Sequence, residues 1–151
     1  MSAVFTVGSI DLFQRVKPLW TRLRDHHAKA SLYFSKELSD ITCERRQSEL
    51  SRKENTGSLF VCVASFGEQD VGYVVASTEN SKAEIDSLFV LDSNQGTGIG
   101  TELVTRALDW IKDRQATSIY VNVAFGNTRA LEFYRKFDIF PRSINLERKT
   151  A

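Results

Sequence analysis

A glycine-rich stretch, Gly96-Thr97-Gly98-Ile99-Gly100, joins an apolar run to an amphipathic segment. The run Ala83–Leu91 predicts a strand, and apolar residues from Ile99 to Ile111 recur at helical spacing. A helix N-terminus leaves backbone N–H groups unpaired and carries a positive partial charge, so it attracts anions. Glycines let that backbone approach a phosphate where a Cβ would clash. The pattern predicts a site for a phosphate-bearing ligand that needs no basic side chain.

Two nucleotide-binding motifs and a plain turn compete with this interpretation of the glycines. A Walker A loop needs Lys followed by Ser or Thr, and neither follows the glycines. A dinucleotide-binding fingerprint needs another glycine where Thr101 stands. A Rossmann-type nucleotide binder would be stabilised by NAD. The plainest alternative is a turn that only connects a strand to a helix.

Asn127 and Tyr134 form a second group with chemical potential. They lie seven residues apart on one predicted helix, which is two turns or about 10.5 Å along its axis. Asn127 is also a good helix N-cap, and Tyr134 lies on the apolar stripe of the helix, where it would serve as a core aromatic. Each residue alone is therefore accounted for by an ordinary structural role.

Together these features resemble the GNAT superfamily of N-acetyltransferases. The stretch from Glu84 through Gln95 to Gly100 resembles the acetyl-CoA-binding motif of that family, an apolar strand followed by Gln/Arg-x-x-Gly-x-Gly/Ala. The stretch Gly126–Tyr134 resembles the family's next motif, with Asn and Tyr at the same spacing. The order of strands and helices matches over nearly the whole chain. The resemblance implies an α/β fold with a mixed sheet of about six strands flanked by about four helices.

The resemblance also implies a function, transfer of an acetyl group from acetyl-CoA to a primary amine by direct attack in a ternary complex. The pantetheine arm would lie along the backbone of Leu88, Phe89 and Val90, with the Val90 N–H directed at the thioester carbonyl. Asn127 would hold the pantetheine, and Tyr134 would give a proton to the departing sulfur. The pyrophosphate and the arm next to it would contact the turn residues, which are Gln95, Gly96, Thr97, Gly98, Ile99, Gly100 and Thr101.

Two carboxylates on the strand are candidates for the general base. Strand alternation puts Glu84, Asp86, Leu88 and Val90 on one face. Glu84 matches the position of the base in histone-type members of the family, and Asp86 is the second candidate. A base can act through a water, so direct contact with the amine is not required. An exposed carboxylate that pairs with a cation is the alternative for Glu84.

Two positions depart from the family pattern. Asp138 replaces a glycine after the Tyr134 helix, and Asp tolerates the left-handed conformation that such a turn needs. Asn122 replaces a glutamate that members acting on protein N-termini carry, which leaves this substrate class without its base. The missing carboxylate favours the rival function, a non-catalytic acyl-CoA-binding module that senses CoA or regulates a partner.

The remaining elements frame these residues. Strands are predicted at Val4–Val7, Leu59–Phe66, Val71–Ser77, Ala83–Leu91, Ser118–Phe125 and across Ile144 and Leu146. Helices are predicted after Asp11, from about Ser35 to Asn55, from Ile99 to Ile111 and from Asn127 to Phe137. Pro18 is expected to kink or restart the first helix. The connection from the strand before the glycine turn to the next strand should be parallel and right-handed.

Composition limits the range of functions further. The 151 residues include 20 Lys and Arg against 19 Asp and Glu, a net charge of +1, which gives no electrostatic case for nucleic acid or an anionic membrane. Cys43 and Cys62 are too few for a disulfide framework or a cysteine zinc site. The adjacent His26 and His27 point in different directions on a helix, so we expect no metal. With no long apolar run and no signal peptide, we expect a single cytoplasmic domain over residues 1–151.

The acceptor stays open at this stage. The segment from Asp11 to Asn55 would line the acceptor side by family analogy, and it mixes aromatic residues with both signs of charge. A small-molecule amine and a peptide amine are both compatible with it. Dimers are common among similar proteins, so a homodimer is a further expectation of the resemblance.

Overall fold

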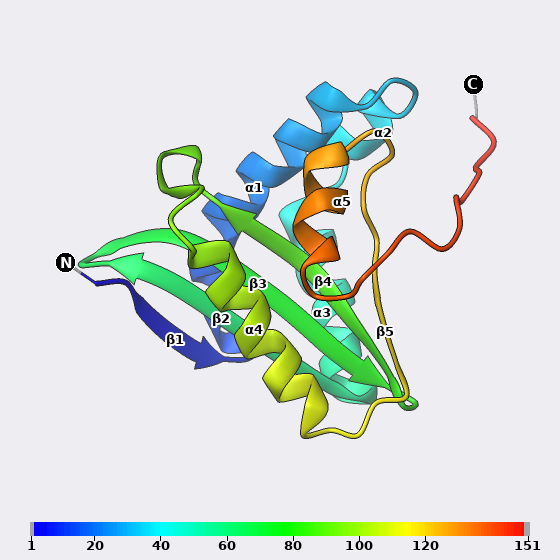
Figure 1. Ribbon diagram of the computed structural model, residues 1–151. Coiled ribbons are helices and arrows are strands. Elements are labelled where there is room, and N and C mark those ends of the chain that lie inside the picture. Colours follow the sequence, from blue (N-terminus) through cyan, green and yellow to red (C-terminus); the bar gives the residue numbers. More distant parts are fainter. Residues whose placement is uncertain (1, 150–151) are drawn as a thin grey trace.

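The computed structural model describes residues 2–149 and arranges five strands in one mixed sheet (Figure 1). The strands are β1 Val4–Gly8, β2 Ser58–Phe66, β3 Gln69–Glu79, β4 Lys82–Val90 and β5 Ser118–Val121. They lie in the order β1-β2-β3-β4-β5, antiparallel except for the parallel pair β4–β5. The mixed sheet and the parallel crossover confirm the predicted fold class.

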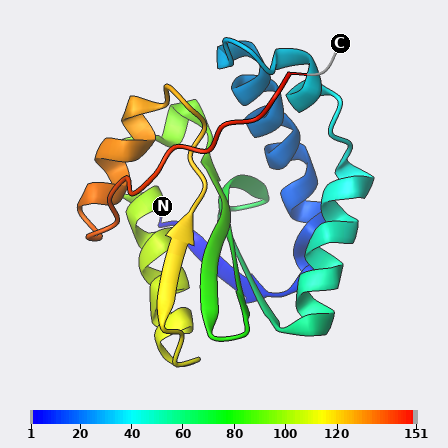
Figure 2. The ribbon, with the colours of Figure 1, turned by 90° about the vertical axis from the view of Figure 1, so that its right-hand side faces the viewer.

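Helices cover both faces of this sheet. The α-helices are α1 Phe13–Ala30, α2 Ser35–Ser39, α3 Cys43–Thr56, α4 Ile99–Lys112 and α5 Thr128–Arg135, and short 3-10 turns span Ile10–Leu12 and Asp92–Asn94. Figure 2 shows α1, α2 and α3 on one side of the sheet and α4 and α5 on the other. The site described below lies where β4, β5 and both helical layers meet.

The central strands β2 and β3 form the core because both of their faces are covered. Cys62, Val63 and Val74 are fully buried, which explains why these strands are continuous apolar runs. Helix α4 adds an apolar face of Leu103, Val104, Ala107 and Ile111. Burial raises the pKa of Cys62 to about 11, so its thiol is protonated at neutral pH and serves as packing.

The helical segment before the central strands differs from its prediction. One helix was expected from about Ser35 to Asn55, but α2 ends at Ser39 and α3 begins at Cys43. The side chain of Thr42 accepts a hydrogen bond from the Arg45 N–H at 3.1 Å and caps the new helix. Helix α1, in contrast, continues through Pro18 without a restart, which was one of the two outcomes expected there.

The last predicted strand does not form within the described residues. No described residue after Arg135 lies in a helix or strand, and Ile144 and Leu146 are 72% and 88% exposed. Alternating apolar residues predict a strand only where a neighbouring strand offers its backbone, and within residues 2–149 the segment has none. The sheet therefore has five strands instead of about six.

Two irregularities in β4 shape the site. Val75 pairs with Ser87 and Ala76 pairs with Ile85, so Asp86 is an extra residue, a β-bulge. On its other side, β4 pairs with β5 only from Lys82 to Ile85. Beyond that point the two strands part and leave one edge of β4 without a neighbouring strand among the described residues.

None of the helices within residues 2–149 combines the length and apolar character that a membrane crossing requires.

Candidate active site

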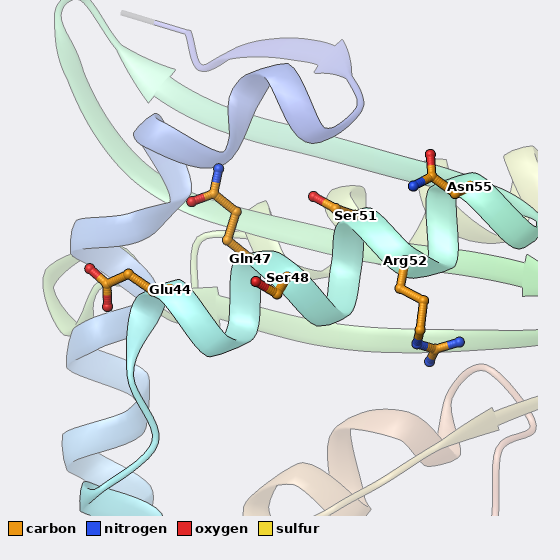
Figure 3. A pocket seen from close by; sticks show the side chains of 6 residues that line it. All are labelled: Glu44, Gln47, Ser48, Ser51, Arg52 and Asn55. Atoms are coloured by element: carbon orange, nitrogen blue, oxygen red, sulfur yellow. The ribbon is translucent and has the colours of Figure 1, made fainter.

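A cavity of about 1300 Å³ opens where β4 and β5 part. Its walls come from α1–α3, from β4, from the turn before α4 and from α5. It brings together most of the residues that the sequence singled out, which are Asp86, Leu88, Phe89, Val90, Gln95, Gly96, Gly98, Gly100, Thr101, Asn127 and Tyr134. Glu84, Thr97 and Ile99 do not line it. A smaller depression lies on the outer surface of α3, and all its lining side chains come from that one helix (Figure 3).

The glycine turn adopts the conformation that its sequence suggests. Gly96 and Gly98 have φ angles of 78° and 90°, which residues with a Cβ rarely adopt. Gly98 is the N-cap of α4 and offers no side chain to the first amides of the helix. A Cβ on either glycine would meet no protein atom within 4 Å. The turn therefore presents a bare backbone and a helix N-terminus to the cavity, an arrangement suited to an anion.

Gln95 and Thr97 hold this turn in place. The Gln95 Nε2 donates hydrogen bonds to the Val90 carbonyl at 2.9 Å and to the Asp92 carboxylate at 3.2 Å. The Thr97 hydroxyl donates to the Asn94 carbonyl. Both side chains thus have structural partners within the protein. Ile99 points into the core and is 5% exposed.

Two basic side chains, Lys136 and Arg129, also line the cavity, and the sequence analysis did not identify them. Lys136 donates a hydrogen bond from Nζ to the Thr101 hydroxyl at 2.8 Å, and Arg129 lies on α5. The motif contains no basic residue, so only the packing of α5 beside α4 reveals these charges. Lys136 adds positive potential next to the helix N-terminus.

The free edge of β4 offers backbone groups to the cavity. The Leu91 N–H donates to the Val71 carbonyl at 2.8 Å, and hydrogen-bonded pairs alternate along an antiparallel ladder. Phe89 therefore directs its N–H and C=O at β3, whereas Leu88 and Val90 direct theirs away from it. The hydrogen bond from Gln95 to the Val90 carbonyl agrees with this alternation. Of the three strand residues predicted to bind through their backbone, Leu88 and Val90 face the open side.

The β-bulge at Asp86 changes which side chains of β4 lie on the same face of the sheet. Glu84 pairs with Ser77, and Ser87 pairs with Val75, so both β4 residues share the face of those β3 residues. Leu88 and Val90 fall on the opposite face, contrary to the simple alternation expected from the sequence. The extra residue, Asp86, shifts the pattern by one position.

The two carboxylates share one cation. The Lys53 Nζ lies 2.8 Å from the Glu84 carboxylate and also bonds to one oxygen of Asp86. The side chain of Asp86 is fully buried, and its second oxygen, Oδ2, has no hydrogen-bond partner among the described residues. Asp86 lines the cavity and Glu84 does not. The structure thus distinguishes two residues that look equivalent in the sequence.

This environment changes the proton affinity of both partners. Burial raises the pKa of Asp86, against the opposing effect of the hydrogen bond from Lys53. Burial alone would lower the pKa of Lys53, but its hydrogen bonds to Asp86 and Glu84 outweigh burial and raise it. Lys53 therefore stays charged at neutral pH, and Asp86 binds a proton more strongly than an ordinary aspartate.

Asn127 and Tyr134 occupy the α5 wall of the cavity. The Asn127 side chain accepts a hydrogen bond from the Ala130 N–H at 3.1 Å, which confirms the predicted N-cap. Tyr134 is 7% exposed, and burial raises its pKa to about 12, so its hydroxyl keeps its proton at neutral pH. The turn after the helix has Asp138 at a φ of 59°, the left-handed conformation expected there.

Comparisons with known proteins identify relatives of the chain. The Acetyltransferase (GNAT) family matches residues 20–139. An uncharacterised N-acetyltransferase of Methanocaldococcus jannaschii is 29% identical over 56% of this chain and 39% of its own length. Another, from Archaeoglobus fulgidus, is 35% identical over 52% of this chain and 58% of its own length. The chain thus matches less than two thirds of the length of either relative.

A solved structure shows the same fold. The aminoglycoside N-acetyltransferase AAC(6')-Iy, crystallised in complex with CoA, has a TM-score of 0.72 to this chain. The two are 12% identical, and the match covers 99% of this chain and 96% of the other. At this identity the likeness establishes the arrangement of strands and helices.

Proposed function

Because this chain belongs to the acetyltransferase (GNAT) family, we propose that it transfers an acetyl group from acetyl-CoA to a primary amine. One observation supports this most strongly. A single cavity joins a bare helix N-terminus, the free edge of β4 and the protonated hydroxyl of Tyr134. An acyl-CoA needs these same three features, for its pyrophosphate, its amide-containing arm and its departing sulfur.

The residues fit acetyl-CoA along this path. The amides from Gly96 to Thr101 would bind the pyrophosphate, and Lys136 would add positive charge beside it. The outward groups of Leu88 and Val90 would hydrogen bond to the pantetheine arm as an added strand does. The free amide of Asn127 would contact the same arm, since only its oxygen is used for capping.

Two buried side chains, Tyr134 and Asp86, would act as the general acid and the general base. The amine nitrogen attacks the thioester carbon, the C–S bond breaks, and the thiolate sulfur takes the proton of the Tyr134 hydroxyl. We propose Asp86 in place of Glu84 as the group that receives the amine proton, directly or through a water. Its place among the residues that line the cavity, which Glu84 lacks, and its raised pKa support this choice, and the burial of its side chain favours transfer through a water. The Val90 N–H would stabilise the developing oxyanion.

The alternative, a non-catalytic acyl-CoA-binding module, shares the glycine turn but needs neither Asp86 nor Tyr134. A panel of primary amines incubated with acetyl-CoA tests the difference through release of free thiol. Thiol release that depends on an amine supports the enzyme. Binding of acetyl-CoA without amine-dependent release supports the module.

A further inference from the structure

A pair of hydroxyl groups joins the core of the sheet to the wall of the cavity, next to the bulge of β4. The Tyr73 hydroxyl oxygen lies 2.6 Å from the Ser87 Oγ. Tyr73 comes from β3 and is fully buried, whereas Ser87 is half-buried and lines the cavity. Ser87 pairs with Val75, so Tyr73 is its diagonal neighbour on the same face of the sheet.

The hydroxyl pair lies on the face of the sheet that α3 covers. Arg46 on α3 donates from Nη2 to the Asp86 carbonyl at 2.9 Å, and this carbonyl belongs to the peptide group that precedes Ser87. The positive charge of Arg46 also acts on the pKa of Tyr73, which places the phenol on the α3 side. Val90 lies on the opposite face, beside the start of α4. The Ser87 hydroxyl and the glycine turn are therefore on different sides of β4.

The direction of the hydrogen bond between the two hydroxyls follows from burial. Burial raises the pKa of Tyr73 well above its ordinary value, so the phenol keeps its proton at neutral pH. Ser87 is the one hydrogen-bond partner of this phenol among residues 2–149. A buried donor without an acceptor is costly, so Tyr73 donates and the Ser87 oxygen accepts.

The proton of Ser87 is then free for a ligand. A serine hydroxyl has one proton, and the bond from Tyr73 uses a lone pair of the oxygen instead of that proton. In the part of the chain that the structure describes, no protein group accepts the Ser87 proton. The bond from Tyr73 holds the oxygen in place, so Ser87 offers the cavity one positioned, uncharged hydrogen-bond donor.

We propose that Ser87 is a specificity-determining residue that donates a hydrogen bond to an uncharged oxygen of the acceptor, and that Tyr73 positions it. This inference rests on the proposed function and deepens it. Both hydroxyls are neutral, and the adjacent Arg46 is already paired with Glu49 at 3.2 Å, so this point of the wall suits an ether, hydroxyl or carbonyl oxygen. A positioned donor loses little rotamer freedom when it binds. An acceptor with such an oxygen is therefore preferred to its hydrocarbon analogue.

The test uses pairs of primary amines of equal length, one with a terminal methoxy group and one without. The pairs are methoxyethylamine and butylamine, methoxypropylamine and pentylamine, and methoxybutylamine and hexylamine. An ether oxygen accepts hydrogen bonds but cannot donate one. In at least one pair, the ratio of kcat/KM for the ether to that for the alkylamine should fall about three- to tenfold in Ser87→Ala, the effect of one neutral hydrogen bond. Ser65→Ala is the matched control, because it removes a buried serine hydroxyl on β2 outside the cavity, and it should leave every ratio unchanged.

Two further variants separate recognition from stability. Ser87→Ala leaves the Tyr73 hydroxyl without a partner and should lower the Tm. The double variant Tyr73→Phe/Ser87→Ala removes both hydroxyls, so it should recover Tm but not the ether preference. Tyr73→Phe alone releases the Ser87 oxygen and should reduce the preference in part. Each ratio compares two substrates with one sample, so it does not depend on the fraction of folded protein.

The outcomes distinguish this inference from the proposed function. If amines are turned over and Ser87→Ala leaves every ratio unchanged, the inference is overturned and acetyl transfer stands. An equal loss of turnover with both members of every pair overturns it too, because such a loss is not selective for the oxygen. If no amine is turned over, the proposed function fails and the Tm in the presence of CoA decides. The acetylated ether should then raise the Tm more than the acetylated alkylamine, and Ser87→Ala should abolish the difference. Equal or absent stabilisation overturns the inference as well.

Discussion

Asp86→Asn tests whether turnover requires the carboxylate of Asp86. The substitution preserves the shape of a fully buried side chain and removes its charge. In the native cluster, Lys53 faces the two carboxylates of Glu84 and Asp86, which leaves one negative charge in excess. The variant cluster is neutral. If Asp86 receives the amine proton, turnover at pH 7 should fall by about 10²–10⁴-fold, or about 2.7–5.5 kcal/mol of transition-state stabilisation.

The thermal stability of Asp86→Asn should be maintained although its turnover falls. The raised pKa of Asp86 means that the folded protein binds its proton more tightly than the unfolded chain does. The ionised side chain therefore opposes folding at neutral pH, and this penalty disappears as the pH falls through the folded pKa. Asp86→Asn removes the penalty, so the Tm at pH 7 should not fall. A typical destabilising substitution costs about 1 kcal/mol and lowers the Tm by about 2–4 °C in a chain of this size.

The assay is thiol release at saturating acetyl-CoA and amine, from pH 6 to 10, with thermal unfolding of the same samples. The variant should regain activity at high pH, where the free amine is abundant. Glu84→Gln is the control, because it removes a charge from the same cluster but not from the cavity. Turnover in Asp86→Asn that equals the wild type with chemistry rate-limiting, or a larger loss in Glu84→Gln, would refute the assignment.

Three further substitutions test other parts of the site. Tyr134→Phe should keep CoA binding but lower kcat by about 10²–10⁴-fold, and unchanged turnover would leave the residue with packing alone. Gly100→Val places its Cβ in ordinary contact with Phe133 and Val90, at 3.6 and 3.7 Å, and the Tm of the apo variant checks that it folds. It should lose the stabilisation by CoA, about 2.7 kcal/mol at 100 times Kd, and normal stabilisation would contradict the phosphate site. Lys53→Met leaves two buried carboxylates without their cation and should cost about 3–5 kcal/mol of stability in chemical denaturation. It should also move the acidic limb of the pH–rate profile to higher pH, and an unmoved limb would exclude coupling to Asp86.

Local patterns in the sequence were enough to predict most of the fold. The continuous apolar runs of β2 and β3 identify buried strands, and the glycine turn marks the start of α4. These features are encoded by neighbouring residues, so they are visible without any tertiary contact. Asn127 is a further example, since its capping role follows from the amide and the helix that it precedes.

The features that were missed depend on contacts between distant segments. The bulge at Asp86 is a mismatch between β4 and β3, so strand alternation alone placed Leu88 on the wrong face. Lys53 lies on a highly charged helix, and only the tertiary structure shows that it reaches across from α3 to the carboxylates of β4. Lys136 joins the glycine turn only because α5 packs beside α4.

The boundary errors have a similar origin. The break at Thr42 depends on one side chain capping α3, and helical periodicity continued across it. Ile144 and Leu146 have the alternation of a strand, but alternation does not specify a partner. Both errors show that a pattern predicts the type of an element better than it predicts where the element ends or whether it pairs.

The most direct test of direct acetyl transfer is an initial-velocity study with acetyl-CoA and the amine varied together. The geometry brings the free edge of β4, Asp86 and Tyr134 into one cavity, so both substrates should be bound before the C–S bond breaks. Reciprocal plots should therefore intersect, and one thiol should be released for each amine acetylated. Parallel lines, which indicate an acetylated enzyme intermediate, or thiol release that does not depend on the amine would contradict the account.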